Sequence, residues 1–296
     1  MKNQKKAYIF AFMSVACWAT VGSAFKITLR YADTYQLVTY SSFVAMLVLL
    51  LWLSIQKNGF SRILKTTKKQ ILRSAFLGFL NPFLYYLILF KAYSLLLAQE
   101  AVALNYLWPI MLVLLSIPLL KQRIGIKNVM ALLVSFSGTL LIATGGKLRE
   151  MHFSEPVGVS LALLSTIIWA LYWIMNMKDT RDELPKLFWN FLFGFVYSVI
   201  TLLLFSKFQP DNIKAITGMV YIGLFEMGIT FVLWLKALKY SVTTAKVSNL
   251  IYLSPFLSLI IVHFAVGEPI LPSTLAGLGL IISGILFQQY VSAKNT

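Results

Sequence analysis

Long apolar runs alternate with short charged segments along the whole chain. A membrane-spanning helix needs about 20 mostly apolar residues, and the sequence holds ten runs of roughly that length. A spanning segment must also satisfy its own backbone hydrogen bonds. The pattern therefore predicts an all-α integral membrane protein with ten transmembrane helices. The predicted helices cover residues 7–25, 34–55, 71–90, 98–119, 126–144, 157–177, 187–206, 215–235, 243–264 and 272–291.

Composition and charge agree with this prediction. Of 296 residues, 59% are hydrophobic and 12% are charged, which lies outside the range of soluble proteins. The net charge is +16, but the basic residues fall in short loops between apolar runs, so the expected partner is the bilayer and not a nucleic acid. With the N-terminus inside, 18 Lys and Arg residues lie on the cytoplasmic side and seven on the other. We therefore predict a multi-pass protein with both termini in the cytoplasm, N-in/C-in.

The first apolar run has two interpretations. "MKNQKKAYIFAFMSVAC" resembles a basic region followed by the apolar region of a cleaved or lipid-modified signal segment. The run, however, continues through Trp18 to Phe25, and Ser14 stands three positions before Cys17 where a lipid-attachment site prefers leucine. We expect a retained helix. Cys17 is the single cysteine, so the fold has no internal disulfide.

The two halves of the chain resemble each other. Four short matches recur at offsets of 151, 145, 146 and 146 residues. The pairs are SVACWA and STIIWA (14–19, 165–170), GFLN and GLFE (78–81, 223–226), NYLWP and IYLSP (105–109, 251–255), and SG (137–138, 283–284). We predict two repeats, residues 1–150 with helices one to five and residues 151–296 with helices six to ten. Five spans per repeat would turn the second copy upside down, which is the architecture of secondary transporters.

Polar residues in the middle of predicted spans are the candidate site. Glu226 lies at the centre of the eighth span, and its repeat mate Asn81 lies at the centre of the third. A charge at the bilayer centre costs at least ~2.5 kcal/mol, so we expect both side chains to face a substrate, with Glu226 carrying a coupled proton. The alternative is a structural hydrogen bond between packed helices, with Glu226 protonated.

Two prolines interrupt corresponding spans. Pro109 and Pro255 each remove a backbone donor and loosen the helix one turn earlier, which predicts a kink or gate. The alternative is a kink that serves only packing. The polar residues of the two loosened turns are predicted to contact the substrate: Asn105, Tyr106, Asn249 and Tyr252.

Aromatic residues near mid-span complete the predicted site. Trp18 and Trp169 are repeat mates, and Tyr172 follows in the same span as Trp169. Aromatic faces enclose flat or cationic ligands, although lipid-facing or core packing explains such residues equally well. Small residues around Gly138 and Gly277 predict close helix approach, with a homodimer as a further interpretation.

Motifs of soluble enzymes are missing from the sequence. It has no phosphate-binding loop, no nucleophile elbow, and only two histidines and one cysteine for metal binding. We therefore expect no enzyme, no cofactor and no metal, and any uphill transport would use an ion gradient or an exchanged solute.

The stretches AQEAVALNYLWP (98–109), IWALY (168–172), GEPI (267–270) and AGLGLIISG (276–284) resemble a known family. Together with the early tryptophan of each half, they are similar to ten-helix, EamA-type members of the drug/metabolite transporter superfamily, and most to its aromatic amino acid exporters. The resemblance implies a bacterial inner-membrane protein. It also implies a central cavity with Trp18, Asn105, Tyr106, Trp169 and Tyr172 at the substrate.

These observations predict a secondary transporter that exports aromatic or neutral amino acids by alternating access. Two alternatives stay open. One is a carrier of another solute class, such as nucleosides, polyamines or drug-like cations, and the other is a membrane protein that does not transport.

Overall fold

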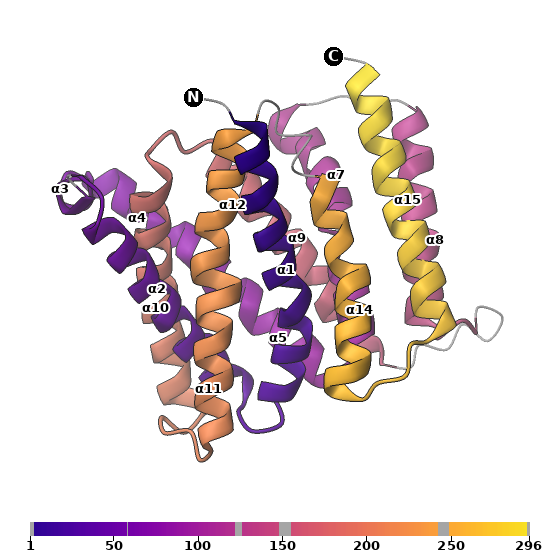
Figure 1. Cartoon of the computed structure of the whole chain (residues 1–296), viewed down its shortest axis with the longest axis horizontal. Helices are drawn as coiled ribbons and strands as arrows, with labels where there is room; N and C mark the ends of the chain where they lie inside the picture. Colours follow the sequence, from indigo (N-terminus) through magenta and orange to yellow (C-terminus); the bar gives the residue numbers. More distant parts are fainter. Residues whose placement is uncertain (1–2, 58, 122–125, 148–154, 242–248, 295–296) are drawn as a thin grey trace.

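The computed structural model describes residues 3–57, 59–121, 126–147, 155–241 and 249–294, and within these ranges every regular element is helical. The helices form one bundle, and α1 begins at the same end of the bundle where α15 ends (Figure 1). The elements are α1 (Gln4–Thr28), α2 (Thr34–Ser54), α3 (Gly59–Leu64), α4 (Lys68–Gly78), η1 (Phe79–Leu84), α5 (Tyr85–Leu95), α6 (Ala98–Asn105), α7 (Trp108–Leu120), α8 (Ile126–Ala143), α9 (Pro156–Met177), α10 (Glu183–Phe205), α11 (Ile213–Ile222), η2 (Gly223–Gly228), α12 (Ile229–Tyr240), η3 (Asn249–Tyr252), α14 (Leu253–Val266) and α15 (Pro272–Lys294).

Seven helices of the described chain are long and apolar enough to cross a membrane, counting contiguous elements such as α11–η2–α12 as one helix. Shorter apolar helices cover Leu133–Ile142, Leu253–Val266 and Pro272–Phe287. The prediction of an all-helical, multi-pass membrane protein is therefore confirmed. The number of ten spans and the N-in/C-in orientation stay predictions.

The main helix contacts made by one half of the chain have equivalent contacts made by the other half. In the first half α1 packs against α12 and α14, and in the second half α9 packs against α5 and α7. Likewise α2 packs against η2, and α10 against η1. In the pairs α2–α10 and α8–α15, a helix packs against its own equivalent in the other half. Figure 1 shows α8 beside α15 at one side of the bundle. Two copies of one helical unit that face each other produce this pattern.

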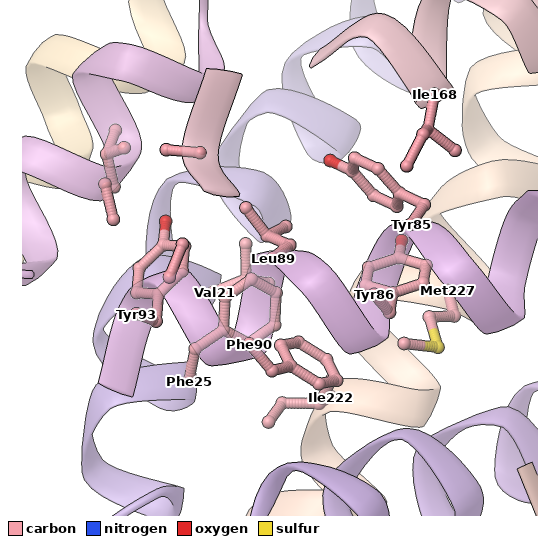
Figure 2. Packing of buried hydrophobic residues seen from close by; sticks show 14 of the residues in the cluster. Val21, Phe25, Tyr85, Tyr86, Leu89, Phe90, Tyr93, Ile168, Ile222 and Met227 are labelled. Carbon is pink, nitrogen blue, oxygen red and sulfur yellow. The ribbon is translucent and has the colours of Figure 1, made fainter. Parts of the chain in front are cut away.

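Aromatic residues of α1 and α5 fill the core between the halves. Phe25 meets Phe90 with a ring-centroid separation of 4.9 Å and Tyr93 with 5.1 Å, both edge to face. The Tyr86 ring lies 5.4 Å from that of Phe90. Figure 2 shows Phe25 and Tyr93 together, with Tyr85 and Tyr86 further along α5. Edge-to-face pairs add about 1 kcal/mol each to the burial of the rings.

Charged residues bind the connection between α9 and α10 to α4. Asp179 Oδ2 lies 2.6 Å from Arg181 Nη2 and 3.5 Å from Arg73 Nε. Burial alone would raise the pKa of Asp179, but its hydrogen bonds from Arg181 and the charges of Arg181 and Arg73 hold that pKa below the ordinary value of 3.8. The stabilisation is present above the ordinary pKa and is lost as the pH falls through the lowered one.

Glycines let α8 and α15 approach each other. A Cβ added to Gly277 would lie 2.5 Å from Ile142 Cγ1 and 2.7 Å from the carbonyl oxygen of Gly138. A Cβ added to Gly138 would lie 2.4 Å from the carbonyl oxygen of Gly277. The predicted close approach of small residues therefore occurs inside the chain, and the homodimer stays a prediction.

We expect Gly277→Leu to separate α8 from α15 and to lower the free energy of unfolding by about 1–3 kcal/mol, the usual cost of overpacking. Thermal unfolding in detergent measures this as a lower Tm. Gly279→Leu is the matched control, because a Cβ there has no neighbour within 4 Å. Equal Tm values for the two variants would contradict the close contact.

Candidate functional site

A cavity of about 310 Å³ lies between the two halves of the chain. Residues of α1, α5, α6 and α7 line it from the first half, and residues of α9, η2, α12 and α14 line it from the second. Ligand pockets begin at about 300 Å³, so the cavity has room for one small solute.

Tryptophans from both halves form the walls of the cavity. The repeat mates Trp18 and Trp169 both line it. Trp18 lies 5.4 Å from Trp234, and Trp169 lies 4.5 Å from Tyr85 and 5.8 Å from Trp173, measured between ring centroids. The site thus presents several ring faces and edges to a flat solute.

Asn105 supplies an amide at the end of α6, and its contacts fix it in place. The Tyr85 hydroxyl donates to Asn105 Oδ1 at 3.3 Å, and Asn105 Nδ2 donates to Ser165 Oγ at 3.1 Å. The Ser165 hydroxyl in turn donates to the carbonyl of Ala162 at 2.6 Å. Asn105 and the neighbouring Tyr106 both line the cavity, as the sequence predicts for substrate contacts.

Glu226 is a buried carboxyl in the cavity wall. It lies in η2, a π-helical turn inside the long helix Ile213–Tyr240. The Tyr86 hydroxyl donates to Glu226 Oε1 at 2.9 Å. Glu226 Oε2 is buried and has no hydrogen-bond partner among the described residues. A proton or a group inside the cavity must therefore satisfy the second oxygen, because a buried, unpartnered carboxylate is costly.

The structure leaves Asn81 and Tyr172 out of the cavity lining. The Asn81 backbone is extended, with φ −150° and ψ 123°, and interrupts the helix before Pro82. Its fully buried amide lies beside the Tyr172 hydroxyl, to which Asn190 Nδ2 donates at 3.4 Å. Extended backbone at Asn81 turns the side chain toward α9 and α10. Glu226, on a turn that stays helical, reaches the cavity, whereas its repeat mate does not.

The two predicted kinks are helix starts. The span that contains Pro109 breaks at Tyr106 and Leu107, and α7 begins at Trp108, so Pro109 occupies the first turn of a new helix. Pro255 occupies the first turn of α14 in the same way. The first turn tolerates proline because its N–H groups have no intrahelical partner. The side chains of Pro109, Asn249 and Tyr252 lie outside the described residues.

Hydrogen bonds close one end of the cavity, where α5 ends and α6 begins. The Lys26 ammonium donates to the carbonyls of Tyr93 at 2.9 Å and Leu96 at 2.5 Å. Glu268, in the connection from α14 to α15, accepts from the amides of Ala98 at 3.0 Å and Gln99 at 3.4 Å. A carboxylate at a helix N-terminus is stabilised by the unpaired amides and the helix dipole. Glu268 of the second half thus binds α6 of the first.

Residues at the other end of the cavity are more exposed. Phe25, Tyr93 and Val102, toward the Glu268 end, are buried, whereas Trp18 and Trp173 are partly exposed. Among the described lining residues, those toward the start of α1 are therefore more exposed than those at the Glu268 end.

The family model of EamA-like transporters matches residues 5–144 and 156–288. The chain belongs to the EamA-like transporter family. The two matched segments also support the repeat organisation. Transport is the activity of this family, which agrees with the prediction that the chain is not an enzyme.

Several relatives of this chain are named as transporters, with no substrate in the name. An uncharacterized transporter of Archaeoglobus fulgidus is 21% identical over 287 residues, covering 95% of this chain and 97% of that one. The uncharacterized transporter YyaM of Bacillus subtilis is 25% identical over 186 residues, 60% of each chain. A solved crystal structure matches with a TM-score of 0.65 at 19% identity and covers 99% of both chains, which shows the shared fold.

Several lining residues were missed by the sequence analysis, although helical spacing signals some of them. Gly22 stands four residues after Trp18, and residues four apart share one helix face. Trp173, four residues after Trp169, is one of the mid-span aromatic residues that the sequence singles out, and it lines the cavity. Tyr85 and Trp234 have no such signal, because only packing decides which side of a uniformly apolar helix faces the cavity. Among the described residues no group of three or more His, Cys, Asp or Glu side chains could hold a metal ion.

Glu268→Gln tests the closed end. The probe is a cysteine at position 102, introduced as Val102→Cys together with Cys17→Ser, and the readout is its rate of reaction with a water-soluble maleimide. Glu268→Gln removes the charge that the α6 amides bind, so the cavity should open at this end more often. The reaction rate of the cysteine at position 102 should then rise about tenfold, which corresponds to about 1.4 kcal/mol less free energy for the closed state. Glu183→Gln is the control, because Glu183 pairs with Lys186 outside the cavity. An unchanged rate in Glu268→Gln would exclude this role.

Proposed function

We propose that the chain is a secondary transporter that carries small metabolites across the cytoplasmic membrane by alternating access. The observation that carries this proposal is one cavity lined by tryptophans at equivalent positions of the two repeats, with buried lining residues toward Glu268 and partly exposed ones toward the start of α1. Inverted-repeat transporters bind their substrate at such a repeat interface. The proposal includes ten spans, N-in/C-in orientation and an upside-down second repeat.

Under this proposal the substrate lies between Trp18 and Trp169 and contacts Asn105 and Tyr106. Asn249 and Tyr252 are proposed as further contacts, since they occupy the equivalent turn of the second repeat. Asn81 and Tyr172 support the site from outside the cavity. Glu226 is proposed to carry the coupled proton, because it is the buried carboxyl of the lining.

The proposed substrates have an aromatic or flat apolar part. The sequence favours aromatic or neutral amino acids, exported from a bacterial cell, and the aromatic walls support a substrate of this shape. Organic cations fit the same walls. A non-transporting membrane protein, such as a lipid-handling factor, would need neither an aqueous cavity nor a closed end.

Counterflow in proteoliposomes tests transport without any driving gradient. Unlabelled solute is loaded inside, and entry of the labelled solute is followed for a panel of aromatic amino acids and aromatic quaternary ammonium ions. We expect saturable entry of at least one solute. Trp169→Ala should raise the half-saturating concentration about tenfold, since one aromatic contact contributes about 1.4 kcal/mol.

Trp189→Ala is the matched control, because Trp189 lies outside the cavity lining and donates to Thr66 Oγ1. Its half-saturating concentration should equal that of the wild type. Absence of counterflow for every solute, in protein that unfolds cooperatively, would rule out the proposed function. An equal effect of the two tryptophan substitutions would rule out the cavity as the site.

A further inference from the structure

The charges of the cavity wall are unbalanced. Glu226 is the only Asp or Glu side chain among the described lining residues, which include no Lys, Arg or His. Lys26 is near, but its ammonium is bound to the carbonyls of Tyr93 and Leu96 at the closed end. The described wall therefore offers a solute one acid and no cation.

The carboxyl of Glu226 is positioned to receive a positive charge. Tyr86 donates to Oε1 at 2.9 Å, and Oε2 is buried without a partner among the described residues. Tyr86 stacks edge to face on Tyr85 at 4.7 Å, and Tyr85 lies 4.5 Å from Trp169. Tyr86 and Tyr85 thus connect the Glu226 carboxyl to the Trp169 ring in the cavity wall.

Aromatic rings favour the same charge. The face of a tryptophan or tyrosine ring attracts a cation within about 6 Å of its centroid, and the attraction is stronger when the pair is desolvated. Trp18, Trp169, Trp173 and Trp234 line one cavity. An ammonium group in this cavity would meet both ring faces and a carboxylate.

For an anion the described wall provides neutral donors but no cation, since Trp173 Nε1 and Ser258 Oγ belong to lining residues and have no hydrogen-bond partner among the described residues. Broken helices in transporters commonly bind a substrate carboxylate at their N-terminal amides. At the start of α7, however, the amides of Ile110 and Met111 both donate to the Leu107 carbonyl, at 2.9 and 3.1 Å, and Pro109 has no N–H. The Asn105 amide, for its part, donates to Ser165.

We propose that the substrates are monovalent organic cations with an aromatic or flat apolar body and no carboxylate, and that Glu226 is the counter-ion of their ammonium group. This inference rests on the proposed transport function and replaces its amino acid substrates by organic cations. A zwitterionic amino acid would place its carboxylate against an aromatic wall with no described cation to receive it, at a cost of several kcal/mol.

The test uses two probes that differ only in the carboxylate. Phenethyltrimethylammonium is permanently cationic, and the N,N,N-trimethyl derivative of phenylalanine is the same molecule with a carboxylate. Binding to the purified protein is followed by intrinsic tryptophan fluorescence, and exchange is followed by counterflow with each probe. We expect the cation to bind at least tenfold more tightly than the zwitterion and to exchange faster.

Glu226→Gln should raise the Kd of the cation at least tenfold and leave the Kd of the zwitterion within about threefold. Glu183→Gln removes an acid outside the cavity and should change neither Kd. Glu226→Asp keeps the charge and should restore part of the cation affinity. Cooperative unfolding of every variant in detergent verifies that each is folded.

Equal or tighter binding of the zwitterion, or free phenylalanine exchanging while the cation does not, would overturn this inference and leave the proposed function intact. Unchanged cation affinity in Glu226→Gln would overturn the role of the carboxyl. Failure of both probes and of every amino acid to bind or exchange would remove the proposed function as well.

Discussion

The need to satisfy polar groups away from water governs this structure. Lipid offers no hydrogen bonds, so an ionisable or amide side chain in mid-membrane is stable only against a partner or a cavity. Asn190 meets this need in part, since its Nδ2 donates to the Tyr172 hydroxyl at 3.4 Å, and the buried Asn81 amide lies beside that hydroxyl. Glu226 meets it only in part, since Tyr86 satisfies one oxygen and the cavity adjoins the residue. The buried acid therefore depends on the cavity beside it.

The packing of the two halves positions the cavity and the residues that line it. Helices α1 and α9 each contact helices of the opposite half, so their tryptophans reach one space from two directions. Helices α8 and α15 pack through Gly138 and Gly277 at the side of the bundle (Figure 1), and the described cavity lining includes no residue of either helix. Glu268 joins the second half to α6 at the closed end. Gln99 of α6 adds two hydrogen bonds to the same connection, since its side chain donates to the Pro269 carbonyl and accepts from the Leu271 amide.

The sequence predicted the features that depend on local pattern. Apolar runs located most of the described helices to within a few residues, because span length is set by the bilayer and not by packing. Residues 243–248 of the predicted ninth span lie outside the described residues. Internal repetition pointed to Trp18, Trp169 and Glu226, which all line the cavity. It also pointed to Asn81, which does not, since an extended backbone at one residue redirects the side chain. Tyr85 and Tyr86 carry no signal in sequence, because their roles arise from contacts with Asn105 and Glu226 on distant segments.

The central claim is that an aqueous substrate site lies between the repeats, and cysteine accessibility tests it most directly. Ser254 lines the cavity on α14, and Ser198 on α10 is equally buried but outside the lining. In a Cys17→Ser background, Ser254→Cys should react with a small water-soluble thiol reagent, and saturating aromatic solute should slow that reaction, while Ser198→Cys should stay unreactive. Equal reactivity of the two cysteines, or no reaction of either in folded protein, would contradict the account.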